Sequence, residues 1–225
     1  MSPRRISKLI TKIENSLAQE YGTREFTPHG SAMDVLIGTI LSQNTSDVNS
    51  SRAHKNLKKK FSSYKALGNA DTDDIAKAIK SGGLADRKSK SISSALKQIK
   101  SDQGRHTLSN LKNISDKEAL KYLLSLPGVG EKTAACVLLF ALGREVMPVD
   151  THIHRITLRL GLVQNTNDRS KSFQFWFGQN IDDYYTFHLN LIRHGRRVCR
   201  AGRPLCERCV IRNWCEYYTE KVKNG

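Results

Sequence analysis

Four of the five cysteines in this 225-residue chain stand close together near its end. They are Cys199, Cys206, Cys209 and Cys215, separated by six, two and five residues. Four thiolates can hold one metal centre, but structural zinc usually takes two close pairs joined by a longer loop. Only the middle two form such a pair, so the spacing favours a [4Fe-4S] cluster, with zinc or a disulfide framework as alternatives. The fifth, Cys136, lies in an apolar stretch and is expected to be a small buried hydrophobe.

The cysteine count also bears on the compartment. An odd number cannot pair completely, and a chain of this length does not need disulfides for stability. No secretory signal is visible in Met1–Lys8, and the longest apolar run, Ala134–Leu142, is too short for a membrane span. The basic residues between positions 4 and 12 could belong to an organelle-targeting helix, but Glu14 and Glu20 argue against one. We therefore expect an intracellular protein.

The charge balance is strongly basic. Lysine and arginine total 37 against 21 aspartates and glutamates, which gives a formal net charge of +16. Such an excess indicates a polyanionic partner rather than ordinary solubilisation of the surface. Nucleic acid is favoured over an anionic membrane, because no long amphipathic helix with bulky apolar anchors accompanies the charge. The basic residues gather in two groups: Lys55, Lys58, Lys59 and Lys60; and Arg193, Arg196, Arg197, Arg200 and Arg203.

The apolar pattern predicts an all-α fold. Apolar residues recur at helical spacing through most of the chain, and alternating strand patterns of useful length are absent. Short segments with Gly, Asn and Asp separate most of the helices. The expected helices are Ile6–Tyr21, one from Ser31 or Asp34, Val48–Phe61, Thr72–Lys80, Lys88–Ile99, Asp116–Ser125, Glu131–Leu142, His152–Leu160, Ser172–Trp176 and Tyr184–Arg193.

A glycine-rich turn lies between two of these helices, in Leu126–Thr133. Pro127 ends the first helix, and Gly128 and Gly130 allow the backbone to turn tightly and expose its amides. The amides lie at the start of the next helix, whose partial positive charge favours a phosphate. The exposed amides predict a sequence-independent contact with the phosphates of a DNA backbone. The alternative is a plain turn between packed helices.

Lys132 follows this turn, and Asp150 comes eighteen residues later. In the first helical turn the dipole disfavours an ammonium, and a neutral amine can attack an electrophilic carbon to form a Schiff base. A carboxylate at Asp150 could support positive charge developing on a sugar ring. The alternatives are a solvated lysine and an aspartate that caps the helix starting near Thr151.

Taken together, Leu126–Thr133, the stretch from Gly143 to His152 and the four-cysteine loop resemble the helix-hairpin-helix DNA glycosylase superfamily, and the endonuclease III family most. The resemblance runs from about Phe26 to Cys215. It implies an all-α fold of two helical lobes flanking a DNA-binding cleft. One would be a six-helix barrel with the hairpin, residues 26–146. The other would be a discontinuous iron–sulfur cluster lobe, residues 1–25 and 147–225.

The resemblance also implies a reaction. The protein would be a bifunctional DNA glycosylase with abasic-site β-lyase activity that removes oxidised pyrimidines. Lys132 would attack the sugar as the base leaves, and Asp150 would stabilise the cationic sugar. Its partner would be double-stranded DNA with damaged bases or abasic sites, bound by a monomer without any membrane contact. The expected location is with DNA, in a prokaryotic cytoplasm or nucleoid, or in a nucleus.

Several DNA contacts follow from the same resemblance. Gln43 or Asn44 would fill the gap left by the flipped nucleotide, and Leu84 would wedge the opposite strand. The bland alternatives are a polar pair at a helix end and a core leucine. The remaining expected contacts to the DNA backbone are Gly128, Val129, Gly130, Thr133, Arg200 and Arg203.

Two departures from the family pattern leave the preferred base open. Glu131 stands where the family often has a basic residue, and the Gln43–Asn44 pair differs from the bacterial Ala-Gln arrangement. A related glycosylase for mismatched or methylated pyrimidines is therefore a second hypothesis. A third, from another class, is a non-catalytic DNA-binding module with a structural cluster.

Overall fold

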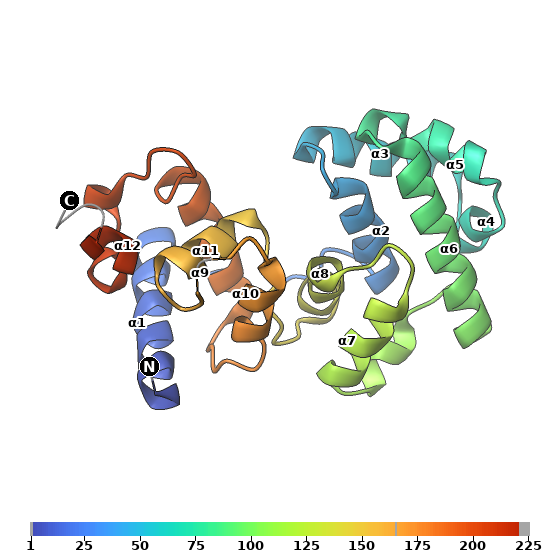
Figure 1. Ribbon diagram of the computed structural model, residues 1–225. Helices are drawn as coiled ribbons and strands as arrows, with labels where there is room; N and C mark the ends of the chain where they lie inside the picture. The colour runs from blue at the N-terminus through green and yellow to red at the C-terminus, as the bar shows by residue number, and fades with distance from the viewer. Residues whose placement is uncertain (1, 165, 221–225) are drawn as a thin grey trace. The chain divides into compact units, whose positions relative to one another are not determined.

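A computed structural model describes residues 2–164 and 166–220, and across these ranges it contains helices and no strands. The all-α prediction is confirmed (Figure 1). No helix in the described ranges is both long and apolar enough to cross a membrane. The elements are α1 (Pro3–Tyr21), α2 (Ala32–Ser42), α3 (Asp47–Lys60), α4 (Tyr64–Gly68), α5 (Thr72–Ile79), η1 (Lys80–Gly82), α6 (Ala85–Gln103), η2 (Ser109–Asn113), α7 (Asp116–Ser125), α8 (Glu131–Leu142), α9 (Thr151–Arg159), α10 (Arg169–Trp176), α11 (Tyr184–Arg197), η3 (Cys206–Arg208), η4 (Arg212–Trp214) and α12 (Glu216–Tyr218).

The chain divides into two compact units. The central unit is Pro28–Leu142, and the terminal unit joins the residues up to Thr27 with those from Gly143 onwards. The sequence placed these breaks at 25/26 and 146/147, whereas in the structure they fall at 27/28 and 142/143. The second break immediately follows α8, because that helix belongs wholly to the central core.

The core of the central unit is organised around α8. Every residue from Ala134 to Leu139 is at most 6% exposed, as a helix that is apolar on all sides requires. Helix α8 packs against α2 and α7, while α6 packs against α5, α4 and α2. Cys136 is buried within this helix, as expected.

Capping boxes define the starts of two central helices. Ser31 accepts a hydrogen bond from the Asp34 main chain at the start of α2, and the Asp34 carboxylate accepts one from the Ser31 main chain in return. Ser115 and Glu118 make the same reciprocal pair at α7. Each box satisfies two amides that a helix N-terminus would leave unpaired.

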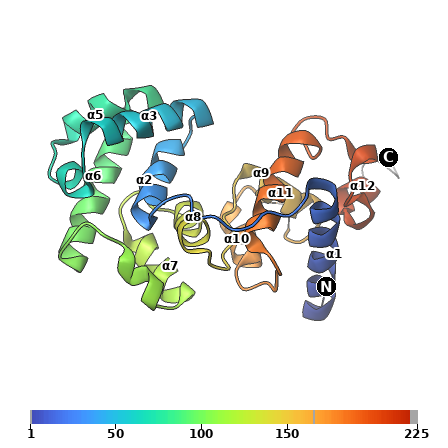
Figure 2. The ribbon, with the colours of Figure 1, turned by 180° about the vertical axis from the view of Figure 1, so that it is seen from behind.

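The terminal unit joins the two ends of the chain through α1 and α11. Helix α1 packs on α11, which packs on α9, and the far side of this arrangement is seen in Figure 2. Asn190 on α11 is 1% exposed, and its amide donates to the carbonyls of Leu17 and Gly22 at 3.4 and 2.9 Å. The Arg24 amide in turn donates to Thr186 Oγ1 at 2.9 Å. These bonds fix the segment after α1 against a helix more than 160 residues later in the chain.

Candidate functional site

The glycine-rich turn forms a tight hairpin between α7 and α8. Gly128 has a φ of 78°, and a Cβ there would lie 2.6 Å from the side chain of Ser91 on α6. Both the left-handed backbone and this close approach require glycine. The Val129 amide donates to the Leu126 carbonyl at 3.1 Å, which closes the turn. No added Cβ at Gly130 would meet another described atom within 4 Å, so the backbone there is open to a ligand.

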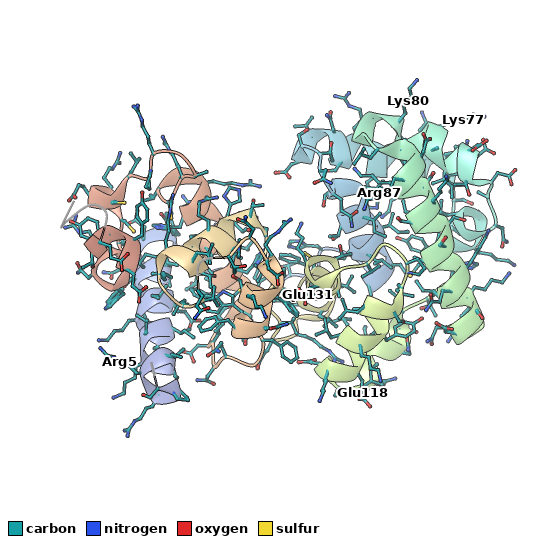
Figure 3. The ribbon with its side chains drawn as sticks, in the orientation of Figure 1. Arg5, Lys77, Lys80, Arg87, Glu118 and Glu131 are labelled. Carbon is teal, nitrogen blue, oxygen red and sulfur yellow. The ribbon has the colours of Figure 1, made fainter. Side chains whose placement is uncertain are left out.

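Lys132 is exposed in the first turn of α8, and the seven residues that follow it, 133–139, are buried. The neighbouring Thr133 is 3% exposed, and Glu131, labelled in Figure 3, begins the helix. Gln43, in the loop after α2, donates from Nε2 to the Gly128 carbonyl at 3.3 Å and to Thr133 Oγ1 at 3.4 Å. The structure therefore brings together the hairpin, the start of α8 and the loop that carries Gln43.

Two exposed residues that were predicted to enter DNA have unusual backbone conformations. Asn44 and Leu84 have φ values of 51° and 52°, and in the described ranges they are the non-glycine residues with positive φ. Asparagine tolerates this region, but leucine rarely adopts it. Leu84 is also 51% exposed, although large apolar side chains are normally buried. An exposed leucine on strained backbone indicates a functional constraint and argues against the core-leucine alternative.

Lys88 is a residue of this region that the sequence did not identify. It is 2% exposed, and its ammonium donates to the carbonyls of Leu41 and Gly82 at 2.7 and 2.8 Å. Burial lowers the pKa of Lys88 from its ordinary value. No sequence pattern marks a lysine whose partners are main-chain carbonyls of two distant loops.

Asp150 is the N-cap of α9. Its Oδ1 accepts hydrogen bonds from the amides of His152 and Ile153, both at 2.8 Å. The capping role that the sequence offered as an alternative is therefore present, and it fixes the orientation of the carboxylate. His154, by contrast, is buried and hydrogen-bonds to Ser172 and Thr166, so it is a packing residue.

Arg155 connects this cap to the start of the cysteine region. Its Nη2 lies 2.9 Å from the Gly195 carbonyl and 3.0 Å from His152 Nδ1, and its Nε donates to the Cys199 carbonyl at 2.9 Å. The first turn of α9 is thus held to the end of α11. The sequence gave no signal for this role, since an arginine on a helix is ordinarily a surface residue.

All four clustered cysteines line one cavity in the terminal unit. Burial, with a smaller contribution from the three neighbouring cysteines, raises the pKa of the Cys209 thiol to about 12. Within the described ranges, no three His, Cys, Asp or Glu side chains lie close enough to hold a single metal ion. Four thiols around one cavity are a donor set that a metal centre can take.

Arg159 holds the loop between the first two cysteines. It donates to Cys199 Sγ at 3.2 Å and to the carbonyls of Arg200 and Ala201 at 2.7 and 3.0 Å. The loop leaves Arg200 and Arg203 exposed, as a role in phosphate binding requires.

The predicted residues fall in both units. Gln43, Asn44, Leu84, Gly128, Val129, Gly130, Lys132 and Thr133 belong to the central unit, whereas Asp150, Arg200, Arg203 and the four cysteines belong to the terminal unit.

Comparison with known proteins decides the family. The model of the HhH-GPD superfamily base excision DNA repair proteins matches residues 37–176. The chain belongs to this superfamily. Within the HhH-GPD superfamily it is a base excision repair DNA glycosylase of the endonuclease III family. Endonuclease III of Sulfolobus acidocaldarius is 32% identical over 84% of this chain and 83% of its own length.

Other HhH-GPD relatives and structures extend the comparison. An Arabidopsis thaliana relative described as a DNA glycosylase is 38% identical over 77% of this chain, which spans only 59% of that relative's length. An endonuclease III in a non-covalent DNA complex shares the fold at a TM-score of 0.77, with 22% identity and 99% coverage of both chains. A thermostable thymine-DNA glycosylase gives 0.75, with 22% identity and 97% coverage of both chains.

Proposed function

We propose that this protein is a bifunctional DNA glycosylase and abasic-site lyase that removes oxidised pyrimidines through a Schiff base on Lys132. The observation that carries the proposal is an exposed lysine at the start of a buried helix, directly after a glycine hairpin. Residues 133–139 of that helix are buried, so the exposed Lys132 at its start is the side chain that can contact DNA.

The reaction begins when the Lys132 amine attacks C1′ of the damaged nucleotide. The glycosidic C1′–N bond breaks, and the base leaves with its electron pair and takes up a proton. Opening of the sugar ring gives a Schiff base between Nζ and C1′. Loss of a proton from C2′ then expels the 3′ phosphate by β-elimination, and water releases the sugar remnant from the lysine.

Asp150 has an electrostatic role in the first of these steps. Its carboxylate is fixed by two main-chain amides, so it does not need to reorganise as positive charge develops on the sugar. A preorganised carboxylate stabilises such a charge more than a mobile one does.

The DNA backbone is held by positive charge and by main-chain amides. The hairpin amides around Gly128–Gly130 and the exposed Arg200 and Arg203 contact phosphates. Gln43 or Asn44 fills the vacated position, and Leu84 enters the opposite strand. The protein acts as a monomer where the DNA is, in a cytoplasm, nucleoid or nucleus.

The four cysteines hold a [4Fe-4S] cluster in this proposal. All four cysteines line one cavity, and their spacing in the sequence favours a cubane over zinc. When bound, the cluster supplies a cross-link that fixes residues 199–215. Burial raises the pKa of the Cys206, Cys209 and Cys215 thiols, and a bound metal centre would take them as thiolates.

Borohydride trapping on an abasic-site duplex tests the lyase. We expect the wild type to form a covalent adduct, and Lys132→Gln to form none. Lys121→Gln removes another exposed lysine from the preceding helix and should trap normally. A wild type that does not trap would remove the lyase from the proposal.

Asp150→Asn separates the catalytic role of this residue from its capping role. Asparagine is nearly as good an N-cap as aspartate, so the variant should fold and bind DNA normally. Loss of the negative charge should slow base excision by at least tenfold, measured in single turnover. Normal excision by this variant would mean that Asp150 serves only as a cap.

A second target class is favoured by Gln43 and Asn44. This pair differs from the bacterial Ala-Gln arrangement. Asn44 has a left-handed backbone, and the side chain of Gln43 is held by the Gly128 carbonyl, so the loop is fixed in place. Such a loop suits selection of a mismatched or methylated pyrimidine. Excision measured on a panel of oxidised, methylated and mismatched duplexes distinguishes the two target classes.

A further inference from the structure

Lys88 is a charged residue in an unexpected place. It lies in the first turn of α6 and is 2% exposed, whereas nearby Lys77 and Lys80 extend outward in Figure 3. Burying an ammonium costs free energy, and neutral carbonyls offset that cost less well than a carboxylate would. An apolar side chain at this position would fill a core more simply. The two carbonyls that Lys88 binds lie at the ends of α2 and η1, so its ammonium can hold both segment ends at once.

The partners of Lys88 share one property: each precedes a loop proposed to enter DNA. The Leu41 carbonyl lies at the end of α2, just before the loop with Gln43 and Asn44. The Gly82 carbonyl lies just before Leu84, and the Lys88 main-chain amide donates to the Leu84 carbonyl at 2.9 Å. The Lys88 side chain therefore holds the segment just before Leu84, and the Leu84 carbonyl accepts the first main-chain bond of α6.

The same helix also supports the hairpin. Ser91 lies three residues after Lys88, about one turn along α6, and is the residue that an added Cβ at Gly128 would strike. Gln43 closes the arrangement through its bond to the Gly128 carbonyl. One face of α6 thus contacts all three segments of the central unit that are proposed to bind DNA.

We infer that Lys88 is a positioning residue that fixes the gap-filling loop and the Leu84 wedge at one spacing, so that both enter the duplex together. The inference rests on the proposed function of those two loops. Two hydrogen bonds from one ammonium make the spacing rigid before DNA binds. This preorganisation lowers the cost of inserting side chains into a stack that must be opened.

The test measures how strongly the protein prefers a duplex with a tetrahydrofuran abasic-site analogue over the intact duplex. This analogue cannot form a Schiff base, so the result is independent of Lys132. Lys88→Met should lose roughly tenfold of the preference, with little change for intact DNA. Lys90→Met, on an exposed residue of the same helix, is the control for loss of one charge and should keep the preference.

A double-mutant cycle separates positioning from general stability. If Lys88 acts through the wedge, Leu84→Ala and Lys88→Met together should lose no more preference than the larger single change. Losses that multiply, or a full preference in Lys88→Met, would overturn the inference. Thermal melting checks that each variant is folded. If Lys88→Met unfolds, Lys88→Gln, which keeps one donor group, replaces it. That variant should lose an intermediate amount of the preference for the analogue duplex. A wild type without any preference would refute the proposed function, and the inference with it.

Discussion

The central unit and the cysteine segment, residues 199–220, are held together by different forces. In the central unit, apolar faces of α2, α6 and α8 pack into a continuous core. In the cysteine segment, η3, η4 and α12 contribute no buried residues, and Ile211 is its one large apolar side chain below 9% exposure. This segment is held instead by arginine hydrogen bonds and by four thiols around a cavity.

The difference shows which part of the molecule depends on a bound group. Fixing one residue's backbone costs about 1–2 kcal/mol, and burial of apolar area returns only about 25 cal/mol per Å². The central unit has a continuous buried apolar core. The cysteine segment has one large buried apolar side chain, so in the proposed function the metal centre is what keeps it folded. Four predictions test this contrast.

The largest effect is expected from Cys209→Ser. Under the proposed function this change removes one cluster ligand, so the cluster should be lost and the segment should unfold. Residues 199–220 should then become sensitive to limited proteolysis, while Pro28–Leu142 stays protected. Visible absorption and iron content measure the loss.

Cys136→Ala is the matched cysteine control. Cys136 lies in the core of the central unit, so its truncation should cost about 1 kcal/mol and leave the iron unchanged. Equal loss of iron in both variants would contradict the assignment of the ligands.

Leu138→Ala tests the opposite unit. This leucine is 0% exposed on α8, and its truncation should destabilise the central unit by about 3 kcal/mol. Urea unfolding measures the change. Under the proposed function, the protein should keep its full iron content. Loss of iron together with unfolding of the central unit would show that the two regions are not held independently.

Asp34 makes the stability of the central unit depend on pH. Burial alone would raise the pKa of this carboxyl, but hydrogen bonds from Lys58, Ser31 and Tyr64 outweigh it and lower the pKa below its usual range. The stabilisation is therefore present above the unfolded pKa of about 4 and is lost as the pH falls below it. Asp34→Asn should cost about 2 kcal/mol at pH 7.

The same variant should also flatten the fall in stability from about pH 5 down to about pH 2, measured by urea unfolding. Asp73→Asn, on an exposed residue in the first turn of α5, should change the stability and its pH dependence much less than Asp34→Asn does. An unchanged pH profile in Asp34→Asn would contradict the ionic role of Asp34.

The smallest effect is expected from Arg203→Ala. This exposed residue lies on the loop between Cys199 and Cys206, so its loss should weaken binding to every duplex alike. The slope of log affinity against log salt should fall by about one unit. A loss confined to one base sequence would show a base contact instead.

The sequence located some helices to the residue and others only roughly. Helices α7 and α8 have the expected bounds, because Pro127 and the glycines of the hairpin interrupt the helical pattern. Helix α6 starts at Ala85 rather than Lys88, since Leu84 caps it in a left-handed conformation that no sequence rule assigns to leucine. Helix α4 was missed because five residues are too few to show a period.

The candidate site was predictable where a residue's chemistry does not depend on packing. Lys132 and Asp150 follow from a local turn and a helix start, and both lie at such positions. Lys88, Arg155 and Arg159 act through main-chain carbonyls of distant segments, and a sequence does not record where those carbonyls will be.

The most direct test of the account is to map the borohydride-trapped adduct by peptide mass spectrometry. A single modified peptide that carries the sugar remnant on Lys132 is the predicted result. A remnant on another lysine or on the N-terminal amine would contradict the assignment, because the nucleophile would then lie outside the hairpin and α8.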